Sequence, residues 1–331
     1  MKKVAFIGGG SFGTALAILL SKKGIQSNVF DIDKDVVDDI NINRKNDRYI
    51  RGLYINEEVR AFTDLNEAID NVDYLVLSVP SHVVRNICKE LNDKLNSNTI
   101  IINIAKGIEN ETYLRLSEVI EEELENPVVI LSGPSHAEEV AFDIPTSVVV
   151  ASKNIKAAEE IQELFMSENF RVYKSQDVIG IEIGGAIKNV IALAAGICDG
   201  IGYGDNTKAA LISRGMTEIV RIGTKLGGNL QTFFGLTGIG DLVVTCASRH
   251  SRNRKAGYLI GKGVNIDDVI DEVGMVVEGI KATKVFFDLK ENLNIEMPII
   301  DAIYKVVFEN LEIDSAVKML LTRDKKDEVF I

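Results

Sequence analysis

The chain has 331 residues, a length typical of about two domains. It carries 37 Lys and Arg against 49 Asp and Glu, a net charge of −12, and 46% of its residues are hydrophobic. This composition excludes an extended disordered chain, and the acidic balance argues against a protein that binds nucleic acid.

The first half of the chain alternates between short apolar runs and helix-like stretches. The runs are rich in Val and Ile, as buried parallel strands are. We expect strands at Val4–Ile7, Asn28–Phe30, Tyr74–Val79, Thr99–Ile104, Val128–Leu131 and Ser147–Val150. Helical patterns lie between them at Thr14–Lys23, Val83–Leu95, Tyr113–Leu124 and Ile155–Met166. The alternation predicts an α/β domain with a doubly wound parallel sheet.

Strand patterns nearly vanish in the second half of the chain. Helices are expected there at Gly184–Ala195, Lys208–Leu226, Ala282–Asn292 and Met297–Glu309. We therefore expect a first domain over residues 1–178 and a mostly helical second domain over 179–331. No low-complexity linker separates them, so we expect close packing and a ligand cleft between the two.

The cysteines and the N-terminus bear on location. Cys88, Cys198 and Cys246 are too few for a disulfide framework, and three histidines lie far apart, so we expect no metal site. The apolar run after Lys2 and Lys3 is too short for a signal peptide. No apolar run approaches the roughly 18 residues of a membrane span. We expect a soluble cytoplasmic protein without an integral membrane segment.

A glycine-rich motif, Gly8–Gly13, follows the first expected strand and opens the first expected helix. It satisfies G-x-G-x-x-G in the context that the motif requires. Gly8 permits the tight turn, Gly10 lets the backbone approach a pyrophosphate, and Gly13 allows close helix packing. A glycine turn without a ligand is the alternative, but the βαβ context favours nucleotide binding.

Asp31 comes at the end of the second expected strand, where a carboxylate accepts hydrogen bonds from a ribose 2′-hydroxyl. Asp33 adds a second negative charge that would repel a 2′-phosphate, although Lys34 and Arg44 could reach round to one. A solvated turn is the alternative. The pattern favours NAD over NADP.

Two further strands of the first domain end in polar residues. Lys106 follows the strand near residue 104 and would face the crevice in which such sheets bind ligands; a surface lysine is the alternative. In Ser132–Ala137, the Ser135 hydroxyl and backbone N–H groups could hold an oxyanion or phosphate. Ser135 also precedes Glu138 at capping-box spacing, so it could instead cap a helix.

The second domain contains a lysine, Lys188, inside an otherwise apolar helical pattern. A desolvated lysine has a lowered pKa and can act as a general base, whereas a snorkelling lysine is the structural alternative. Asp241 ends a glycine-rich segment and could orient Lys188, or be a simple loop aspartate. The basic cluster Ser248–Lys255 could bind a phosphate or be an exposed charged loop.

In their order along the chain, six motifs resemble those of bacterial NAD(P)-dependent glycerol-3-phosphate dehydrogenases. They are Gly8–Gly13, Asn103–Gly107, Gly133–Ala137, Gly185–Asn189, Gly235–Asp241 and Ser251–Asn253. The resemblance covers essentially the whole chain. It implies an N-terminal Rossmann-type doubly wound sheet with a mostly α-helical C-terminal domain, often in a homodimer. It also implies interconversion of dihydroxyacetone phosphate and sn-glycerol 3-phosphate, the phospholipid precursor, with NAD or NADP.

The resemblance further implies residue roles, with Lys188 as the proton-transfer group. Substrate contacts would come from Lys106, Gly133, Ser135, Lys188, Asp241, Ser251, Arg252 and Asn253. Cofactor contacts would come from Ser11, Phe12, Lys106, Ala137, Arg252, Val276 and Glu278, beside Gly8, Gly10, Gly13 and Asp31. The Val276 and Glu278 assignments rest on a Val-Val-Glu-Gly match alone. Many relatives have a basic or His residue where this chain has Ile32 and Asp33, which again favours NAD.

Two other functions remain open on the sequence. Another two-domain reductase, such as a β-hydroxyacid dehydrogenase or ketopantoate reductase, would share the architecture, but the basic cluster favours a phosphorylated substrate. A non-catalytic nucleotide sensor would have no use for Lys188 together with Lys106 and Asp241. We therefore expect an enzyme whose partner is a small molecule rather than nucleic acid.

Overall fold

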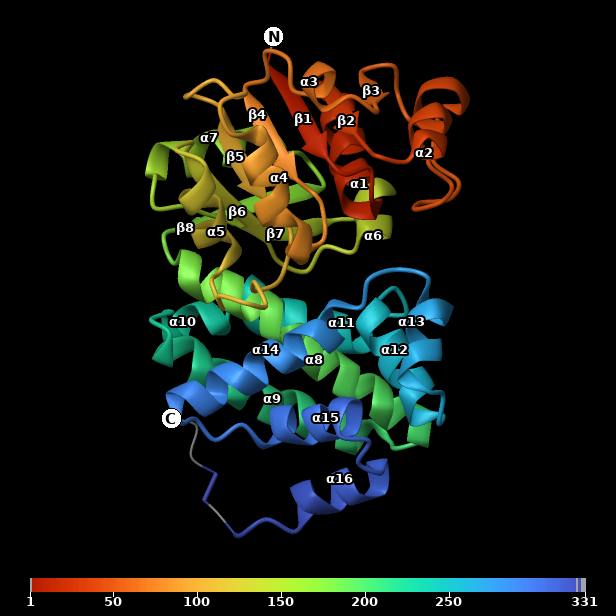
Figure 1. The fold of residues 1–331 in the computed structure, drawn as a ribbon, viewed down its shortest axis with the longest axis vertical. Helices are drawn as coiled ribbons and strands as arrows, with labels where there is room; N and C mark the ends of the chain where they lie inside the picture. Colours follow the sequence, from red (N-terminus) through yellow and green to blue (C-terminus); the bar gives the residue numbers. More distant parts are fainter. Residues whose placement is uncertain (1, 326, 329–331) are drawn as a thin grey trace. The chain divides into compact units, whose positions relative to one another are not determined.

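The computed structural model describes residues 2–325 and 327–328. The chain forms two compact units (Figure 1). The first unit contains the residues up to Ala105 together with Leu116–Val178. The second contains Ile179 onward and also the segment Lys106–Arg115, which groups with these helices although it follows a strand of the first unit.

The first unit is built on an eight-stranded sheet of order β3-β2-β1-β4-β5-β6-β7-β8. The strands are β1 Lys3–Ile7, β2 Gln26–Phe30, β3 Val59–Phe62, β4 Tyr74–Leu77, β5 Ile100–Asn103, β6 Val128–Ser132, β7 Thr146–Ala151 and β8 Phe170–Ser175. Neighbouring strands are parallel except for β6 and β7, which run antiparallel. β1 lies between β2 and β4. Strands β2 and β3 are therefore added on one side of β1 and the later strands on the other, and ligands bind at such switch points.

Helices cover the sheet because its strands are apolar on both faces. The helices of this unit are α1 Ser11–Ser21, α2 Lys34–Asp38, α3 Leu65–Ala68, α4 Val84–Leu91, α5 Leu116–Glu123, α6 Ala137–Ala141 and α7 Ile155–Phe165. Val4 and Phe6 of β1 join one buried cluster with α1, α6 and α7. Ala5 and Ile7 alternate with them, are fully buried, and point to the other face.

The second unit is helical. Its helices are α8 Val178–Ile201, α9 Asp205–Lys225, α10 Leu230–Phe233, α11 Asp241–Ala247, α12 Arg252–Gly261, α13 Ile266–Val273, α14 Glu278–Leu293, α15 Pro298–Phe308 and α16 Ile313–Leu321. A π-helical turn, Leu236–Gly240, leads into α11. The core of this unit gathers buried residues from α8, α9, α14 and α15. The predicted fold class, an α/β domain with a mostly helical C-terminal domain, is confirmed.

The glycines of α8 and α12 allow these two helices to pack backbone to backbone. A Cβ on Gly196 would overlap the carbonyl oxygen of Arg254, and a Cβ on Gly257 would overlap that of Leu193. Larger side chains on either helix would therefore force the helices apart. This contact holds α12, from Arg254 to Gly261, against the C-terminal part of α8, from Leu193 to Gly200.

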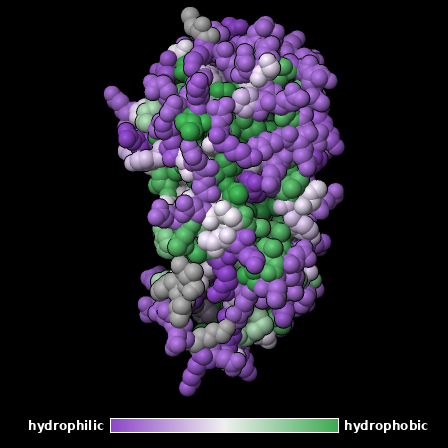
Figure 2. All heavy atoms as spheres, turned by 90° about the vertical axis from the view of Figure 1, so that its left-hand side faces the viewer, coloured by the Kyte–Doolittle hydropathy of each residue, from purple (hydrophilic) through white to green (hydrophobic). Residues whose placement is uncertain are grey.

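Two stretches that include charged residues are nevertheless long and apolar enough to cross a membrane by length and composition alone. They are α8 and the residues Leu230–Ala247. However, 94% of the most apolar stretch of α8 is buried inside the protein, as in the core helix of a folded domain. The face shown in Figure 2 is mostly hydrophilic, with hydrophobic side chains in smaller patches.

Several expected element boundaries differ from the structure. Strands β3 and β8 were not expected, and the helix expected from Tyr113 begins only at Leu116. Tyr113 has a φ of 59°, in the left-handed region, which a helix does not tolerate. The helix expected to Leu95 ends at Leu91, and Asp93 has a φ of 61°.

Candidate functional site

The glycine-rich turn after β1 has the geometry that its sequence predicts. Gly8 has a φ of +108°, and a Cβ there would lie 2.9 Å from the carbonyl oxygen of Ser78. A Cβ on Gly13 would lie 2.6 Å from Oγ of Ser78. The two glycines therefore let the start of α1 lie directly against the end of β4. The assigned reasons for glycine at these two positions are confirmed.

A nicotinamide dinucleotide fits the donors at this turn. A Cβ on Gly10 would meet no other atom within 4 Å, so the space over the N-terminus of α1 is open. The first N–H groups of a helix lack acceptors within the helix and attract phosphate. Ser11 and Phe12 begin α1 and contribute two of these groups. The predicted pyrophosphate cradle would therefore be formed by Gly10, Ser11, Phe12 and Gly13.

The Asp31 carboxylate is fixed at the end of β2 by two backbone donors. Its Oδ2 accepts from the N–H of Gly9 at 2.8 Å, and its Oδ1 accepts from the N–H of Asp33 at 2.9 Å. Each oxygen keeps a further lone pair that could accept from a ribose hydroxyl. Asp31 therefore lies beside the glycine-rich turn, in the position predicted for a ribose ligand.

The expectation that Arg44 could reach a 2′-phosphate is wrong. Its Nε donates to the carbonyl of Ile55 at 3.0 Å, and Nη2 donates to those of Asn56 and Val59. Arg44 thus fixes the loop that leads to β3. Lys34, by contrast, is exposed at the first position of α2.

The turn between β6 and α6 is shaped by Gly133, whose φ is +135° and whose Cβ would approach Cα of Val148 to 3.1 Å. The Ser135 hydroxyl donates to the carbonyl oxygen of Gly133 at 3.1 Å. Helix α6 begins at Ala137 with His136 as its N-cap residue, so the capping-box alternative for Ser135 is wrong. The hydroxyl oxygen of Ser135 stays able to accept a hydrogen bond, and the residue is half-buried.

Three charged residues of the second unit form a compact cluster. Nζ of Lys188, on α8, lies 2.8 Å from Oδ1 of Asp241. Nζ of Lys106 lies 2.7 Å from Oδ2 of the same carboxylate. Asp241 is the first residue of α11, which continues directly from the π-helical turn Leu236–Gly240. The structure thus brings together three predicted residues that lie far apart in the sequence.

Thr245 completes this cluster. It lies one turn after Asp241 on α11, and its Oγ1 is 2.7 Å from Nζ of Lys188. Its own hydrogen is directed to the backbone carbonyl oxygen of Asp241 at 2.6 Å. A threonine hydroxyl has only one hydrogen, so toward Lys188 it acts as an acceptor. Two acceptors, Asp241 and Thr245, therefore hold two of the three hydrogens of the Lys188 ammonium.

The electrostatics of the cluster follow from burial and charge. Burial is the largest influence on Lys188; Asp241 opposes it and Lys106 adds to it, and together they lower the pKa of Lys188 to about 8. Burial alone would raise the pKa of Asp241, but Lys106 and Lys188 outweigh it and lower that pKa. Asp241 therefore stays ionised while Lys188 can gain and lose a proton near neutral pH. The snorkelling alternative for Lys188 is wrong, because only 6% of the residue is exposed.

The segment that carries Lys106 is attached to the second unit at more than one point. The Tyr113 hydroxyl lies 3.2 Å from Oδ2 of Asp288 on α14. Nη1 of Arg115 lies 2.8 Å from Oε2 of Glu182 on α8, and both side chains are largely buried. With the Lys106–Asp241 pair, these contacts fix both ends of the segment to helices.

The predicted phosphate residues lie at the N-terminus of α12. Ser251 caps this helix, since its Oγ accepts from the N–H of Arg254 at 3.2 Å. Arg252 is exposed in the first turn, and its Nη1 lies 3.5 Å from the carbonyl oxygen of Val276. The rest of the basic cluster is partly structural, because Arg254 pairs with Asp199 on α8. Arg252 is thus the exposed guanidinium of this helix start.

Asn253 connects α12 with α8 and α14. Its Nδ2 donates to Oδ1 of Asn189 at 2.9 Å, and its Oδ1 accepts from the N–H of Gly279 at 2.8 Å. Asn189 follows Lys188 directly, and Gly279 follows Glu278 at the start of α14. Val276 and Glu278, which only the motif match had suggested, therefore lie next to the predicted phosphate residues.

Sequence reasoning missed Thr245 and Asn189 as members of the site. Thr245 had one available signal, its spacing of four residues from Asp241, which places both on one face of a helix. Asn189 was noted only as a neighbour of Lys188. Its contact with Asn253 depends on how α8 crosses α12, which no local pattern encodes.

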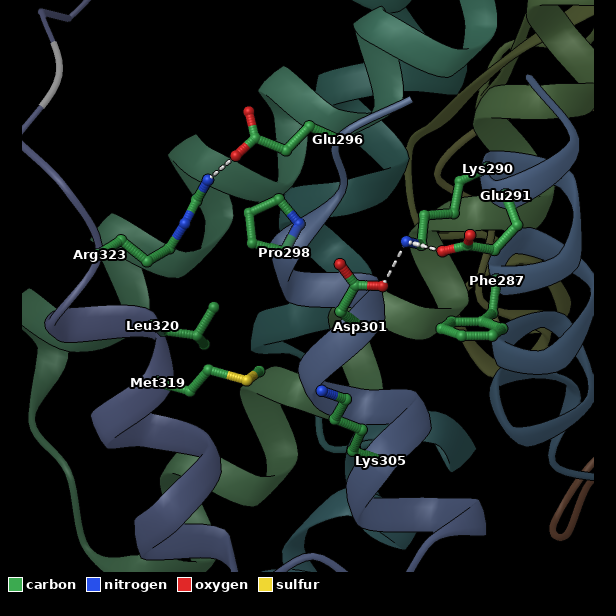
Figure 3. A pocket seen from close by; sticks show the side chains of 10 residues that line it. All are labelled: Phe287, Lys290, Glu291, Glu296, Pro298, Asp301, Lys305, Met319, Leu320 and Arg323. Carbon is green, nitrogen blue, oxygen red and sulfur yellow. Dashed lines mark hydrogen bonds and ion pairs between the residues drawn. The ribbon is translucent and has the colours of Figure 1, made fainter. Parts of the chain in front are cut away.

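A separate cavity of about 460 Å³ lies among α14, α15 and α16 of the second unit. Figure 3 shows Lys290 directed to both Glu291 and Asp301, while Arg323 pairs with Glu296. None of the predicted site residues lines it. Among the residues that the structure describes, no group of three or more His, Cys, Asp and Glu side chains could hold a metal ion.

Comparison with known proteins shows which family this arrangement belongs to. Models described as the N-terminus and C-terminus of NAD-dependent glycerol-3-phosphate dehydrogenase match residues 3–158 and 177–318. Glycerol-3-phosphate dehydrogenase [NAD(P)+] of Clostridium botulinum is 60% identical over 100% of both chains. The protein of that name from Clostridium perfringens is 60% identical over 99% of both. A crystal structure of glycerol-3-phosphate dehydrogenase from Coxiella burnetii superposes with a TM-score of 0.94 at 36% identity, covering 97% of this chain and 99% of that one.

Proposed function

Because this chain belongs to the NAD-dependent glycerol-3-phosphate dehydrogenase family, we propose that Lys188 is the proton-transfer residue of that family's reaction. The enzyme interconverts dihydroxyacetone phosphate and sn-glycerol 3-phosphate with NAD or NADP. The bound cofactor supplies or accepts the hydride, which leaves the protein to bind the substrate and to move one proton.

The observation that carries this proposal is the hydrogen-bonding of Lys188. Asp241 and Thr245 accept two of its hydrogens, so its third position is directed elsewhere. In the reductive direction, Lys188 would donate the third proton to the alkoxide oxygen that forms from the substrate carbonyl. In the oxidative direction, its lone pair would remove the hydroxyl proton.

Lys106 and Asp241 support this step electrostatically. The Asp241 carboxylate is shared by two ammonium groups, so the cluster carries one net positive charge when both lysines are protonated. A positive site stabilises the negative charge that develops on the substrate oxygen. We assign Lys106 to the reacting end of the substrate for this reason.

The substrate phosphate would be bound at the N-terminus of α12. Arg252 offers an exposed guanidinium beside the backbone N–H groups of the first turn, a combination that suits phosphate. Ser251 and Asn253 are buried and hold the backbone there. Binding energy from this distant phosphate would position the carbonyl for reaction. Gly133 and Ser135 complete the assigned substrate contacts.

The cofactor would be held by the glycine-rich turn, with Asp31 on the ribose. Ala137, Val276 and Glu278 are assigned the remaining contacts on the strength of the matching motifs. We further propose a cytoplasmic homodimer that supplies glycerol 3-phosphate for phospholipid synthesis. Analytical ultracentrifugation of the purified chain tests the dimer, and a monomer at micromolar concentration would contradict it.

The decisive experiment follows nicotinamide absorbance with dihydroxyacetone phosphate and either NADH or NADPH, in the wild type and in Lys188→Ala. We expect substrate-dependent oxidation in the wild type and a loss of at least about a thousandfold in kcat for the variant, in the range of general acid–base catalysis. Titration of the cofactor should show that Lys188→Ala still binds it. Retained turnover in a folded variant would refute the role of Lys188.

A further inference from the structure

The residues at the end of β2 bear on how this enzyme distinguishes its two cofactors. NADP carries a phosphate on the ribose hydroxyl that a carboxylate after the second strand binds in NAD. Asp31 is held by the N–H groups of Gly9 and Asp33, so it cannot turn away from an added phosphate. Use of NADP therefore requires a cation nearby to offset the fixed charge of Asp31.

Arg48 is a cation at this edge. Its segment is anchored to the glycine-rich turn, since Nδ2 of Asn46 donates to the carbonyl of Gly9 at 2.8 Å and Oγ of Ser11 lies 3.3 Å from that of Tyr49. The Arg48 side chain is 58% exposed. Its guanidinium carbon lies 5.6 Å from the centre of the Tyr49 ring. Arg48 thus extends into solvent beside the turn that would hold the nucleotide.

Asp33 pairs with this arginine. One carboxylate oxygen of Asp33 accepts from Nη1 of Arg48, and the other accepts from the N–H of Asp35 at 2.9 Å, which caps α2. The charges of Asp31, Asp33 and Arg48 all act on the hydroxyl of Tyr49. Burial raises the pKa of this hydroxyl, Asp31 and Asp33 raise it further, and Arg48 opposes them. Asp31, Asp33 and Arg48 therefore form one electrostatic group around Tyr49, with a net charge of −1.

We propose that Asp33 is a specificity-determining residue that holds Arg48 in an ion pair and thereby withholds it from a 2′-phosphate. In this arrangement, the net negative charge favours a ribose hydroxyl over a phosphate. Without the Asp33 charge, the group becomes neutral, and the guanidinium is released to bind the phosphate with two parallel hydrogen bonds. The inference rests on the nucleotide site of the proposed function, and it names the side chains that choose between the two cofactors.

The test compares Asp33→Asn with the wild type by calorimetric titration of NAD⁺ and NADP⁺. Asparagine keeps an oxygen that can cap α2 and removes only the charge. We expect the ratio of the two dissociation constants to shift toward NADP⁺ by on the order of tenfold, and the ratio of kcat/KM for NADPH over NADH to shift in the same direction. Asp33→Ser, also a good cap, provides a second variant if the first does not fold.

Two further variants, made in the Asp33→Asn background, show which cation is responsible for the gain in NADP⁺ affinity. Arg48→Ala should reverse the gain in NADP⁺ affinity. Arg60→Ala removes the same charge from an exposed position of β3 and should retain the gain. An unchanged ratio in Asp33→Asn, or a gain that survives Arg48→Ala, would overturn the proposal. Failure of the proposed reaction is distinguishable, because the wild type would then oxidise neither cofactor with dihydroxyacetone phosphate while nucleotide affinities stayed measurable.

Discussion

At the scale of single residues, the surroundings of Lys188 link its protonation to the direction of the reaction. Burial and Lys106 lower the pKa of Lys188, and Asp241 limits that fall, so the value is about 8. A lysine with its ordinary pKa would remain almost entirely protonated at neutral pH and would be a poor base. The cluster therefore suits a reaction that runs both ways.

This value predicts opposite pH profiles for the two directions. Reduction needs protonated Lys188, so its kcat should fall as the pH rises through about 8. Oxidation needs the neutral amine, so its kcat should rise over the same interval. Initial rates from roughly pH 6 to 10 in both directions measure this. Two profiles that change in the same direction would show that another group controls the rate.

Arg252 should act on substrate binding more than on chemistry. Arg252→Ala removes the exposed guanidinium at the start of α12. We expect KM for dihydroxyacetone phosphate to rise by about ten- to a hundredfold, the effect of losing a charge-assisted hydrogen bond. Lys255→Ala, an exposed charge on the same helix, is the matched control. An unchanged KM in Arg252→Ala would remove this residue from the phosphate site.

At the scale of secondary-structure elements, the contact between α8 and α12 determines where the residues of the site lie. Gly257→Ala would place a Cβ against the carbonyl oxygen of Leu193, and neither backbone can move without displacing its helix. We expect a loss of about 1–3 kcal/mol in the free energy of unfolding. We also expect weaker substrate binding, because the displaced helices would break the hydrogen bond between Asn253 and Asn189.

Thermal unfolding and KM of Gly257→Ala measure both effects. Gly204→Ser is the control, because a Cβ on Gly204 meets nothing within 4 Å and serine suits its position as the N-cap of α9. Equal stability of Gly257→Ala and the wild type would show that the two helices can separate without cost.

The glycine-rich motif and the periodic hydrophobic patterns made much of the fold and of the candidate site predictable from the sequence. The turn at Gly8 and Gly13 follows from local sterics, and the buried Lys188 follows from its apolar neighbours. Strand β3, by contrast, is only four residues long and lies at the edge of the sheet, where alternation gives little signal. The antiparallel β7 and the contacts of Thr245 and Asn189 depend on tertiary packing, so local propensity could not show them.

At the scale of the whole molecule, the predicted residues are divided between two units. The glycine-rich turn, Asp31 and Ser135 belong to the first, whereas Lys106, Lys188, Asp241 and Arg252 belong to the second. Because the proposed reaction uses both sets, we expect the two units to close on the bound ligands. The chain passes between the units after Ala105, Arg115 and Val178, so these three points are where a hinge can act.

Small-angle scattering tests this expectation. The radius of gyration should decrease when cofactor and substrate are both present, relative to cofactor alone. Pairing dihydroxyacetone phosphate with the oxidised cofactor NAD⁺ keeps the ligands from turning over during the measurement, because neither of them can supply a hydride. An unchanged scattering curve at saturating ligand would count against closure.

The segment Lys106–Arg115 groups with the helical unit, and this determines where chimaeric enzymes should be joined. A chimaera that exchanges the nucleotide-binding part for that of another dehydrogenase, with a single junction after Val178, would import a foreign residue in place of Lys106 and break its match with Asp241. Three junctions, after Ala105, Arg115 and Val178, would keep this short insert with its native helices. Recombination libraries of this family would then retain function more often when residues 106–115 are inherited together with α8 and α11.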